Sequence, residues 1–302
     1  MTPLAPGFFK GKHLVIFGAG YVGGACAAAM GGLGARVTCL TRNPAKVASL
    51  ASEGCDVVID ELSTDAWHSK IKGSVDFVLN CVSSGGGGIE SYRKSYVEGT
   101  RSILAWTAKR GGVGTFVYTS STSVYPQSGG VRVDETAEIA ATVGTPAVLL
   151  EAENLVRAAP AQACRRWFIL RLAGIYGPRR HHLLDQLRAG ETVLGGTGAH
   201  RLNLIHRDDI VSAIMAAFAA PEGVANETFN VADDGAAPKA ELAAWLAAKL
   251  SLPTPTFSGE PTPGRRAVTS DRIIANDKIK GVLGWQPKYP NFRAGYQPLL
   301  EA

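Results

Sequence analysis

The sequence predicts a doubly wound α/β fold with a parallel central sheet, and three observations lead to this prediction. Short, almost continuously apolar segments alternate with segments of helical periodicity. The apolar segments do not alternate with polar residues, which is typical of strands buried on both faces. A glycine-rich turn directly follows the first of them. The chain has 302 residues, of which 46% are hydrophobic, and this composition excludes disorder as its main state.

The elements follow in order along the chain. Strands are predicted at residues 13–17, 36–40, 55–59, 75–81, 115–119, 167–172 and 228–231. Helices are predicted at residues 21–33, 44–51, 89–110, 146–159, 207–219 and 238–250. Asn43 and Thr145 are the expected N-caps of the second and the fourth helix. Because the alternation loosens after residue 172, we expect a first domain at residues 1–172, completed by residues 206–232, and a small C-terminal lobe at residues 173–205 and 233–302.

The composition and charge of the chain indicate which partners and which cellular compartment to expect. The formal net charge is +5 and the basic residues are scattered, so we expect no nucleic-acid partner. Five cysteines without a Cys-x-x-Cys motif suit a reducing compartment. Every apolar stretch falls short of the ~18 residues that a membrane span needs. We therefore expect a cytoplasmic protein without a membrane segment. We also expect no metal site, because adjacent His181 and His182 lack the spacing of metal ligands.

The glycine-rich turn carries the strongest single motif. The segment Gly18-Ala19-Gly20-Tyr21-Val22-Gly23 fits Gly-x-Gly-x-x-Gly between a predicted strand and a predicted helix. In this pattern the first glycine permits the tight turn, the second lets a pyrophosphate approach the backbone, and the third permits close helix–strand packing. Free N–H groups at the helix start attract the anion. The motif predicts dinucleotide binding, and the alternative is a purely structural turn.

The end of the second strand indicates which dinucleotide is preferred. The segment Leu40-Thr41-Arg42-Asn43 contains no carboxylate, whereas an acidic residue here would bind the adenosine ribose hydroxyls. Arg42 can form charge-assisted hydrogen bonds with a 2′-phosphate. The sequence therefore favours NADP over NAD, unless Arg42 is simply a solvated loop residue.

Six motifs in order resemble the extended short-chain dehydrogenase/reductase superfamily, which includes the nucleotide-sugar epimerases and dehydratases. They are the glycine-rich turn, Tyr96-Val97-Glu98-Gly99-Thr100, Thr119-Ser120-Ser121-Thr122-Ser123-Val124-Tyr125, Arg171-Leu172-Ala173-Gly174-Ile175-Tyr176-Gly177-Pro178, Asn203-Leu204-Ile205-His206-Arg207-Asp208-Asp209 and Phe229-Asn230-Val231-Ala232-Asp233. The end of the chain is similar to an atypical bacterial branch of this superfamily. The resemblance covers essentially the whole chain.

The resemblance implies roles for particular residues. Ser121 stands at the position of the family's catalytic serine, and the C-terminal lobe is expected to bind a small-molecule substrate. A homodimer through residues 89–110 and 146–159 is the arrangement that the family implies. The implied cofactor contacts are Gly18, Gly20, Tyr21, Val22, Gly23, Arg42, Val82, Ser83 and Gly174.

One departure from the family affects the chemistry. Classical members carry a Tyr-x-x-x-Lys pair after the fifth strand, in which the lysine lowers the pKa of the proton-donating tyrosine. Here these positions fall on Thr145 and Leu149, and no Tyr-x-x-x-Lys occurs anywhere in the chain. The family's supporting asparagine is replaced by Tyr96. General acid–base help is worth roughly 10²–10⁴-fold in rate, so this loss excludes the ordinary proton donor.

Three alternatives remain open. A relocated acid is one, with Tyr125 as proton donor and Ser121 as hydrogen-bond donor; Tyr92 and Tyr96, one helical turn apart, are further candidates. A substrate that needs no strong protein acid, such as an ene or an imine, is the second. The third is an NADP(H)-binding regulatory or scaffold protein without turnover.

Taken together, we expect an NADP-dependent oxidoreductase or epimerase/dehydratase-like enzyme with a non-classical proton donor and a small polar substrate. The basic loop at residues 179–182 is a candidate anion site for that substrate, unless it is a solvated loop.

Overall fold

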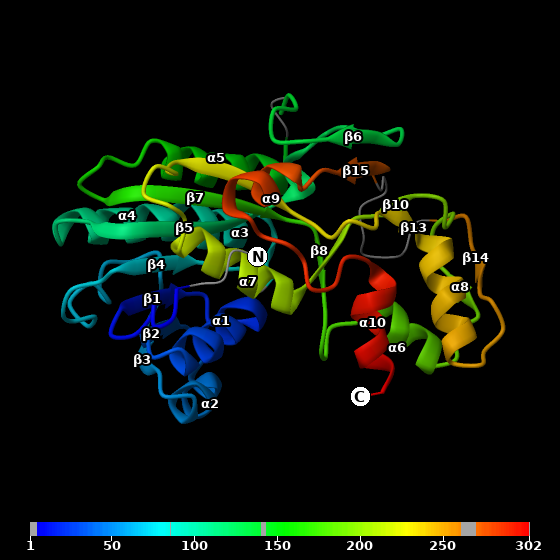
Figure 1. Cartoon of the computed structure of the whole chain (residues 1–302), viewed down its shortest axis with the longest axis horizontal. Helices are drawn as coiled ribbons and strands as arrows, with labels where there is room; N and C mark the ends of the chain where they lie inside the picture. Colours follow the sequence, from blue (N-terminus) through cyan, green and yellow to red (C-terminus); the bar gives the residue numbers. More distant parts are fainter. Residues whose placement is uncertain (1–4, 85, 140–142, 261–269, 302) are drawn as a thin grey trace.

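Seven parallel strands form the central sheet of the computed structural model, which describes residues 5–84, 86–139, 143–260 and 270–301 (Figure 1). The strand order is β12-β7-β5-β4-β1-β2-β3. The prediction of a doubly wound, Rossmann-like α/β fold is therefore confirmed. The strands are β1 (His13–Phe17), β2 (Arg36–Thr41), β3 (Asp56–Ile59), β4 (Phe77–Asn80), β5 (Val113–Ser121), β7 (Cys164–Leu172) and β12 (Glu227–Val231).

Helices cover both faces of the sheet. From β1 the chain moves in one direction to β2 and β3, and later in the other direction to β4, β5 and β7. Because parallel crossovers are right-handed, this reversal places the helices that follow β4 and β5 on the face opposite to those that follow β1 and β2, whereas the helix at Arg207–Phe218 packs beside the first helix. The helices are α1 (Tyr21–Gly32), α2 (Val47–Ser52), α4 (Gly99–Lys109), α5 (Thr145–Arg157) and α7 (Arg207–Phe218). All five residues of β1 are buried, as a strand between two helix layers must be.

Some predicted boundaries shift. Asn43 accepts a hydrogen bond from the Ala45 N–H and caps the short 3₁₀ turn η1 (Pro44–Lys46), as predicted. The predicted cap Thr145 is wrong: Gly144, with φ +73°, is the N-cap, and Thr145 is the first helical residue. The predicted helix at residues 89–110 is divided into α3 (Gly88–Arg93), a π-helical turn η2 (Lys94–Glu98) and α4.

The C-terminal lobe has its own small hydrophobic core. It packs Leu184 of α6 (His182–Arg188) against Leu246 of α8 (Lys239–Lys249) and Phe292 of α10 (Phe292–Leu300). Figure 1 shows these three helices side by side, away from the main sheet. The smaller elements here are β8 (Gly174–Tyr176), β9 (Val193–Leu194), β10 (Arg201–Leu202), β11 (Leu204–His206), β13 (Ala237–Pro238) and β14 (Thr256–Phe257).

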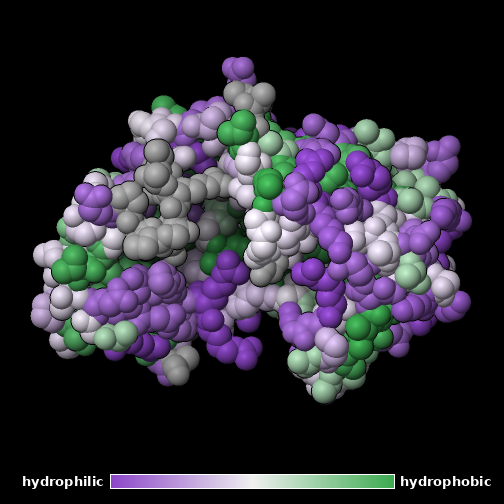
Figure 2. All heavy atoms as spheres, turned by 180° about the vertical axis from the view of Figure 1, so that it is seen from behind, coloured by the Kyte–Doolittle hydropathy of each residue, from purple (hydrophilic) through white to green (hydrophobic). Residues whose placement is uncertain are grey.

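One late segment returns to the larger core. Strand β15 (Arg272–Ile274) pairs with β6 (Val131–Val133), and it is followed by α9 (Asp277–Leu283). Ile279 and Trp285 pack in the hydrophobic core of the sheet. The division into residues 1–172 with 206–232 and residues 173–205 with 233–302 stays a prediction. Figure 2 shows the molecular surface hollowed between the half that carries the sheet and the lobe.

Three further findings concern the described residues as a whole. None of the helices formed by these residues is long and apolar enough to cross a membrane. Within the same residues, no group of three or more His, Cys, Asp or Glu side chains is arranged to hold a metal ion. All five cysteines are free thiols.

Candidate functional site

The three motif glycines have different surroundings. Gly18 has φ +94°, and a Cβ here would lie 2.6 Å from the Val82 backbone nitrogen. A Cβ at Gly23 would lie 2.3 Å from the Gly18 carbonyl oxygen, so this position needs glycine for helix–strand packing. At Gly20 the nearest protein atom would be 3.9 Å away. The fold therefore requires the first and third glycines, whereas the second leaves open space beside the backbone for a ligand.

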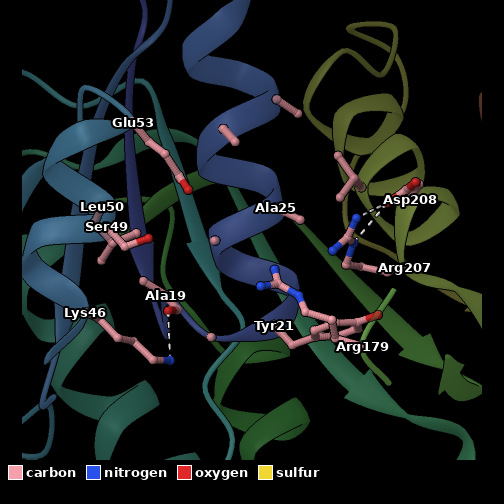
Figure 3. Close-up of a pocket in the computed structure, with 15 residues that line it drawn as sticks. Ala19, Tyr21, Ala25, Lys46, Ser49, Leu50, Glu53, Arg179, Arg207 and Asp208 are labelled. Atoms are coloured by element: carbon pink, nitrogen blue, oxygen red, sulfur yellow. Dashed lines mark hydrogen bonds and ion pairs between the residues drawn. The ribbon is translucent and has the colours of Figure 1, made fainter. Parts of the chain in front are cut away.

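The start of α1 is open to an anion. Gly20 is the N-cap and contributes no side-chain hydrogen bond, and no acidic residue stands in the first turn. The first N–H groups of a helix have no partner within the helix and carry a partial positive charge. A cavity of about 790 Å³ reaches Gly20 and runs along α1, between α2 on one side and α7 on the other (Figure 3). This arrangement suits a pyrophosphate.

Two cations stand beyond the end of β2. The Arg42 side chain is 49% exposed and lies 3.9 Å from Glu61 Oε2, to which Lys94 Nζ also lies within 3.4 Å. Lys46 lines the cavity, and its Nζ donates a hydrogen bond to the Ala19 carbonyl at 3.2 Å. Our sequence reasoning missed Lys46. A lysine four residues after Arg42, in the first helical turn after β2, is a signal that could have revealed it.

The carboxyl ends of four neighbouring strands bring other predicted residues to one edge of the sheet. Gly18 follows β1, Val82 and Ser83 follow β4, Ser121 ends β5 and Gly174 follows β7. Ser121 lies opposite Leu172 in the register of β5 and β7. Ligands of open α/β sheets bind at this edge. The structure therefore brings these residues to the same side of the molecule as the glycine-rich turn.

Ser121 keeps a proton available for hydrogen bonding. Its Oγ accepts from the Ser123 N–H at 3.1 Å and so caps the short 3₁₀ turn Thr122–Val124. A serine hydroxyl that accepts one bond can still donate its own hydrogen. The side chain is partly exposed, and its role as a substrate or nicotinamide contact stays a prediction.

Tyr125 lies in a different environment from the one that a proton donor needs. The residue is 2% exposed. Its hydroxyl donates to Asn230 Oδ1 at 2.8 Å and accepts from Arg171 Nη1 at 2.8 Å. Burial raises the pKa of Tyr125. With both hydrogen-bonding directions used inside the protein, this placement favours a structural role, and the acid role remains without support from the geometry.

The network around Tyr125 is anchored by a buried carboxylate. Glu153 is fully buried and accepts from Arg171, from Ser120 Oγ at 2.6 Å and from Arg157 at 2.6 Å. Burial alone would raise the pKa of Glu153, but the bonds and charge from Arg171 outweigh it and keep this pKa below its ordinary value. Glu153 is therefore ionised and holds β5, α5 and β7 together.

The positions at which the family carries its tyrosine–lysine pair hold other residues. Thr145 begins α5, and Leu149 is 2% exposed. Nearby, the rings of Tyr92 and Tyr96 stack with centroids 4.6 Å apart, and the π-helical turn η2 carries Tyr96. Burial raises the pKa of Tyr96, so its phenol is neutral and available only as a hydrogen-bonding group.

The fold, the glycine-rich turn and the open helix start define a Rossmann-type protein with a place for a dinucleotide. Residues 14–232 match the model of the NAD dependent epimerase/dehydratase family. The chain belongs to this family, as the resemblance to the extended short-chain dehydrogenase/reductase superfamily implied.

The chain is also similar to known proteins and to solved structures. The chain is 31% identical to Protein YeeZ of Escherichia coli (strain K12) over 206 residues, which is 68% of each chain. It is 32% identical to the 3-diazoavenalumate denitrifying reductase of Streptomyces sp. over 139 residues, covering 42% of this chain and 45% of the reductase. Among solved structures, MoeE5 in complex with UDP-glucuronic acid and NAD superposes with a TM-score of 0.81 at 21% identity. That match covers 96% of this chain and 98% of MoeE5.

Proposed function

We propose that this protein binds NADP(H) and transfers hydride to a small polar, electrophilic substrate without the usual tyrosine–lysine pair. The observation that carries the proposal is the difference among the glycines: Gly18 and Gly23 are fixed by packing, whereas Gly20 opens into the cavity at the start of α1. A turn that served only the fold would not need a glycine at the middle position. MoeE5 was solved with NAD, which supports a nicotinamide cofactor on this fold.

Arg42 and Lys46 support a preference for NADP over NAD. Both lie just after β2, where the adenosine ribose of a bound dinucleotide would lie. Both are cations within a few residues of the end of β2. The Lys46 Nζ also donates a hydrogen bond to the Ala19 carbonyl, two residues before α1. A 2′-phosphate would give Lys46 an anionic partner and would compete with Glu61 for Arg42.

The proposed chemistry follows from the missing tyrosine–lysine pair. Thr145 and Leu149 replace the pair, and the Tyr125 hydroxyl is bonded within the protein. We therefore favour a substrate for which hydride transfer dominates, such as an ene, an imine or a diazo compound, with Ser121 as hydrogen-bond donor. The likeness to a reductase of a diazo compound supports this class over an epimerase or a dehydratase.

The proposal is tested by incubating the protein with C4-deuterated NADPH and a panel of enes, imines, carbonyls and diazo compounds. Mass spectrometry then looks for a product that contains deuterium. Deuterium transfer to an ene, imine or diazo compound supports the proposal. Tight NADPH binding with no transfer to any compound would favour the second candidate, an NADP(H)-binding regulatory protein, which the buried Tyr125 hydroxyl also favours.

The homodimer through residues 89–110 and 146–159 stays a prediction. Light scattering of the purified protein measures it directly: a mass of twice 31.7 kDa is expected, and a monomer at micromolar concentration would contradict it.

A further inference from the structure

An unusual arginine lies beside the start of α1. Arg179 has φ +62°, a left-handed conformation that is uncommon for residues other than glycine. It belongs to a tight turn in which Gly177 and Arg180 exchange two backbone hydrogen bonds, at 3.1 and 3.0 Å. Tyr21, the first residue of α1, donates its hydroxyl proton to the Pro178 carbonyl at 3.0 Å. The turn is therefore held against the helix start, although it follows β8 far away in the sequence.

The Arg179 side chain lines the same cavity as the glycine-rich turn. Figure 3 shows it extending over the first turn of α1, with Lys46 also facing the cavity and Arg207 nearby. Arg207 is neutralised by an ion pair with Asp208 at 2.9 Å. In the part of the chain that the structure describes, no acidic side chain lies within ion-pair distance of Arg179. Its charge is therefore available to a ligand in this cavity.

The cavity lining holds three cations, of which Arg207 is paired with Asp208 and Lys46 is the one that we assign to the 2′-phosphate, and one further carboxylate, Glu53. Lys46 comes from η1, Arg179 from the turn after β8 and Arg207 from α7. A planar guanidinium binds two phosphate oxygens at once, which a backbone N–H cannot do. A dinucleotide bound at Gly20 would place its doubly charged pyrophosphate between Arg179 and the N–H groups of α1.

We propose that Arg179 is a pyrophosphate-binding residue that closes over the dinucleotide from the lobe side. This inference rests on the proposed function and adds a residue that the glycine motif does not contain. Arg179 is the first residue of the basic loop at residues 179–182, for which the sequence offered an anion site for the substrate. In this proposal Arg179 binds the cofactor instead.

The test measures the dissociation constant of NADPH by fluorescence for the wild type and for three variants. Arg179→Gly removes the charge and relieves the left-handed strain, so its thermal midpoint is expected to be equal or higher. We expect the dissociation constant to rise about 10-fold in Arg179→Gly and about 3-fold in Arg179→Lys, which keeps the charge but loses the two-oxygen contact. Arg180→Ala is the control. Arg180 has the same charge and lies in the same turn, but its guanidinium lies over the Tyr21 ring, so a change of less than 2-fold is expected.

A second probe separates the two ends of the ligand. Adenosine 2′-monophosphate has no pyrophosphate, so its affinity is expected to stay the same in Arg179→Gly. An unchanged NADPH affinity in Arg179→Gly would overturn the inference. It would also be overturned if Arg180→Ala lowered the NADPH affinity as much as Arg179→Gly does, or if Arg179→Gly lowered the affinity for adenosine 2′-monophosphate as much as that for NADPH. Either result would indicate a general effect of charge. A wild type that binds neither NADPH nor NADH would overturn the proposed function as well.

Discussion

Replacing Tyr125 with phenylalanine separates a structural from a catalytic role for this residue. The substitution removes one hydroxyl that accepts from Arg171 and donates to Asn230, both at 2.8 Å. Hydrogen bonds to charged groups contribute about 1.5–3 kcal/mol each, and a buried partner left without a bond adds a desolvation cost. We therefore expect the free energy of unfolding to fall by about 2–3 kcal/mol. A change of 1 kcal/mol shifts the midpoint by roughly 2–4 °C in a protein of this size class.

Tyr118→Phe is the matched control. The Tyr118 hydroxyl is equally buried, but the described residues offer it no hydrogen-bond partner. Its removal is therefore expected to be neutral or slightly stabilising. Urea unfolding and deuterium transfer from C4-deuterated NADPH are measured on both variants. An unchanged stability of Tyr125→Phe together with loss of hydride transfer would refute the structural role and place this hydroxyl at the substrate.

Three further predictions concern the glycine turn, the cofactor preference and the pH dependence. Gly23→Ala brings a methyl group against the Gly18 carbonyl and is expected to lower the free energy of unfolding by about 1–3 kcal/mol, measured by urea unfolding; an unchanged midpoint would contradict the packing role. Arg42→Ala and Lys46→Ala are each expected to raise the dissociation constant of NADPH at least 5-fold and leave that of NADH unchanged, so equal losses for both would refute the 2′-phosphate assignment. Burial raises the pKa of Asp233 to about 8, so the folded state holds a proton that the unfolded state releases near pH 4. The contribution of this group to stability is then fully present below about pH 4 and is lost as the pH rises to about 8. Thermal midpoints of Asp233→Asn between pH 5 and 8 should decline less steeply than those of the wild type, and parallel curves would be evidence against this titration.

The sheet was predictable because its strands are buried on both faces. Segments such as His13–Phe17 are short, apolar and bounded by glycine, so their positions follow from composition alone. The strands of the lobe are only two or three residues long, which is too short for any periodicity. The π-helical turn at Lys94–Glu98 keeps the same apolar spacing as a continuous helix, so the sequence did not reveal it.

Parts of the candidate site depend on contacts between distant residues. The motif predicted the glycine turn because its requirements are local. The burial of Tyr125 depends on Arg171 and Asn230, 46 and 105 residues away in the sequence. The position of Arg179 at the start of α1 depends on the Tyr21–Pro178 bond, across 157 residues. Such pairs arise from the strand order of the sheet, which a single sequence does not show directly.

Gly20→Ala tests most directly whether this turn exists to bind a pyrophosphate. The residue has φ −91°, and its added Cβ would meet no protein atom closer than 3.9 Å, so the fold should tolerate alanine with a change in stability of about 0.5 kcal/mol or less. We predict that the wild type binds NADPH more tightly than NADH, and that Gly20→Ala loses at least 100-fold in NADPH affinity at an unchanged thermal midpoint. Equal NADPH binding by both proteins, or none by the wild type, would contradict the account.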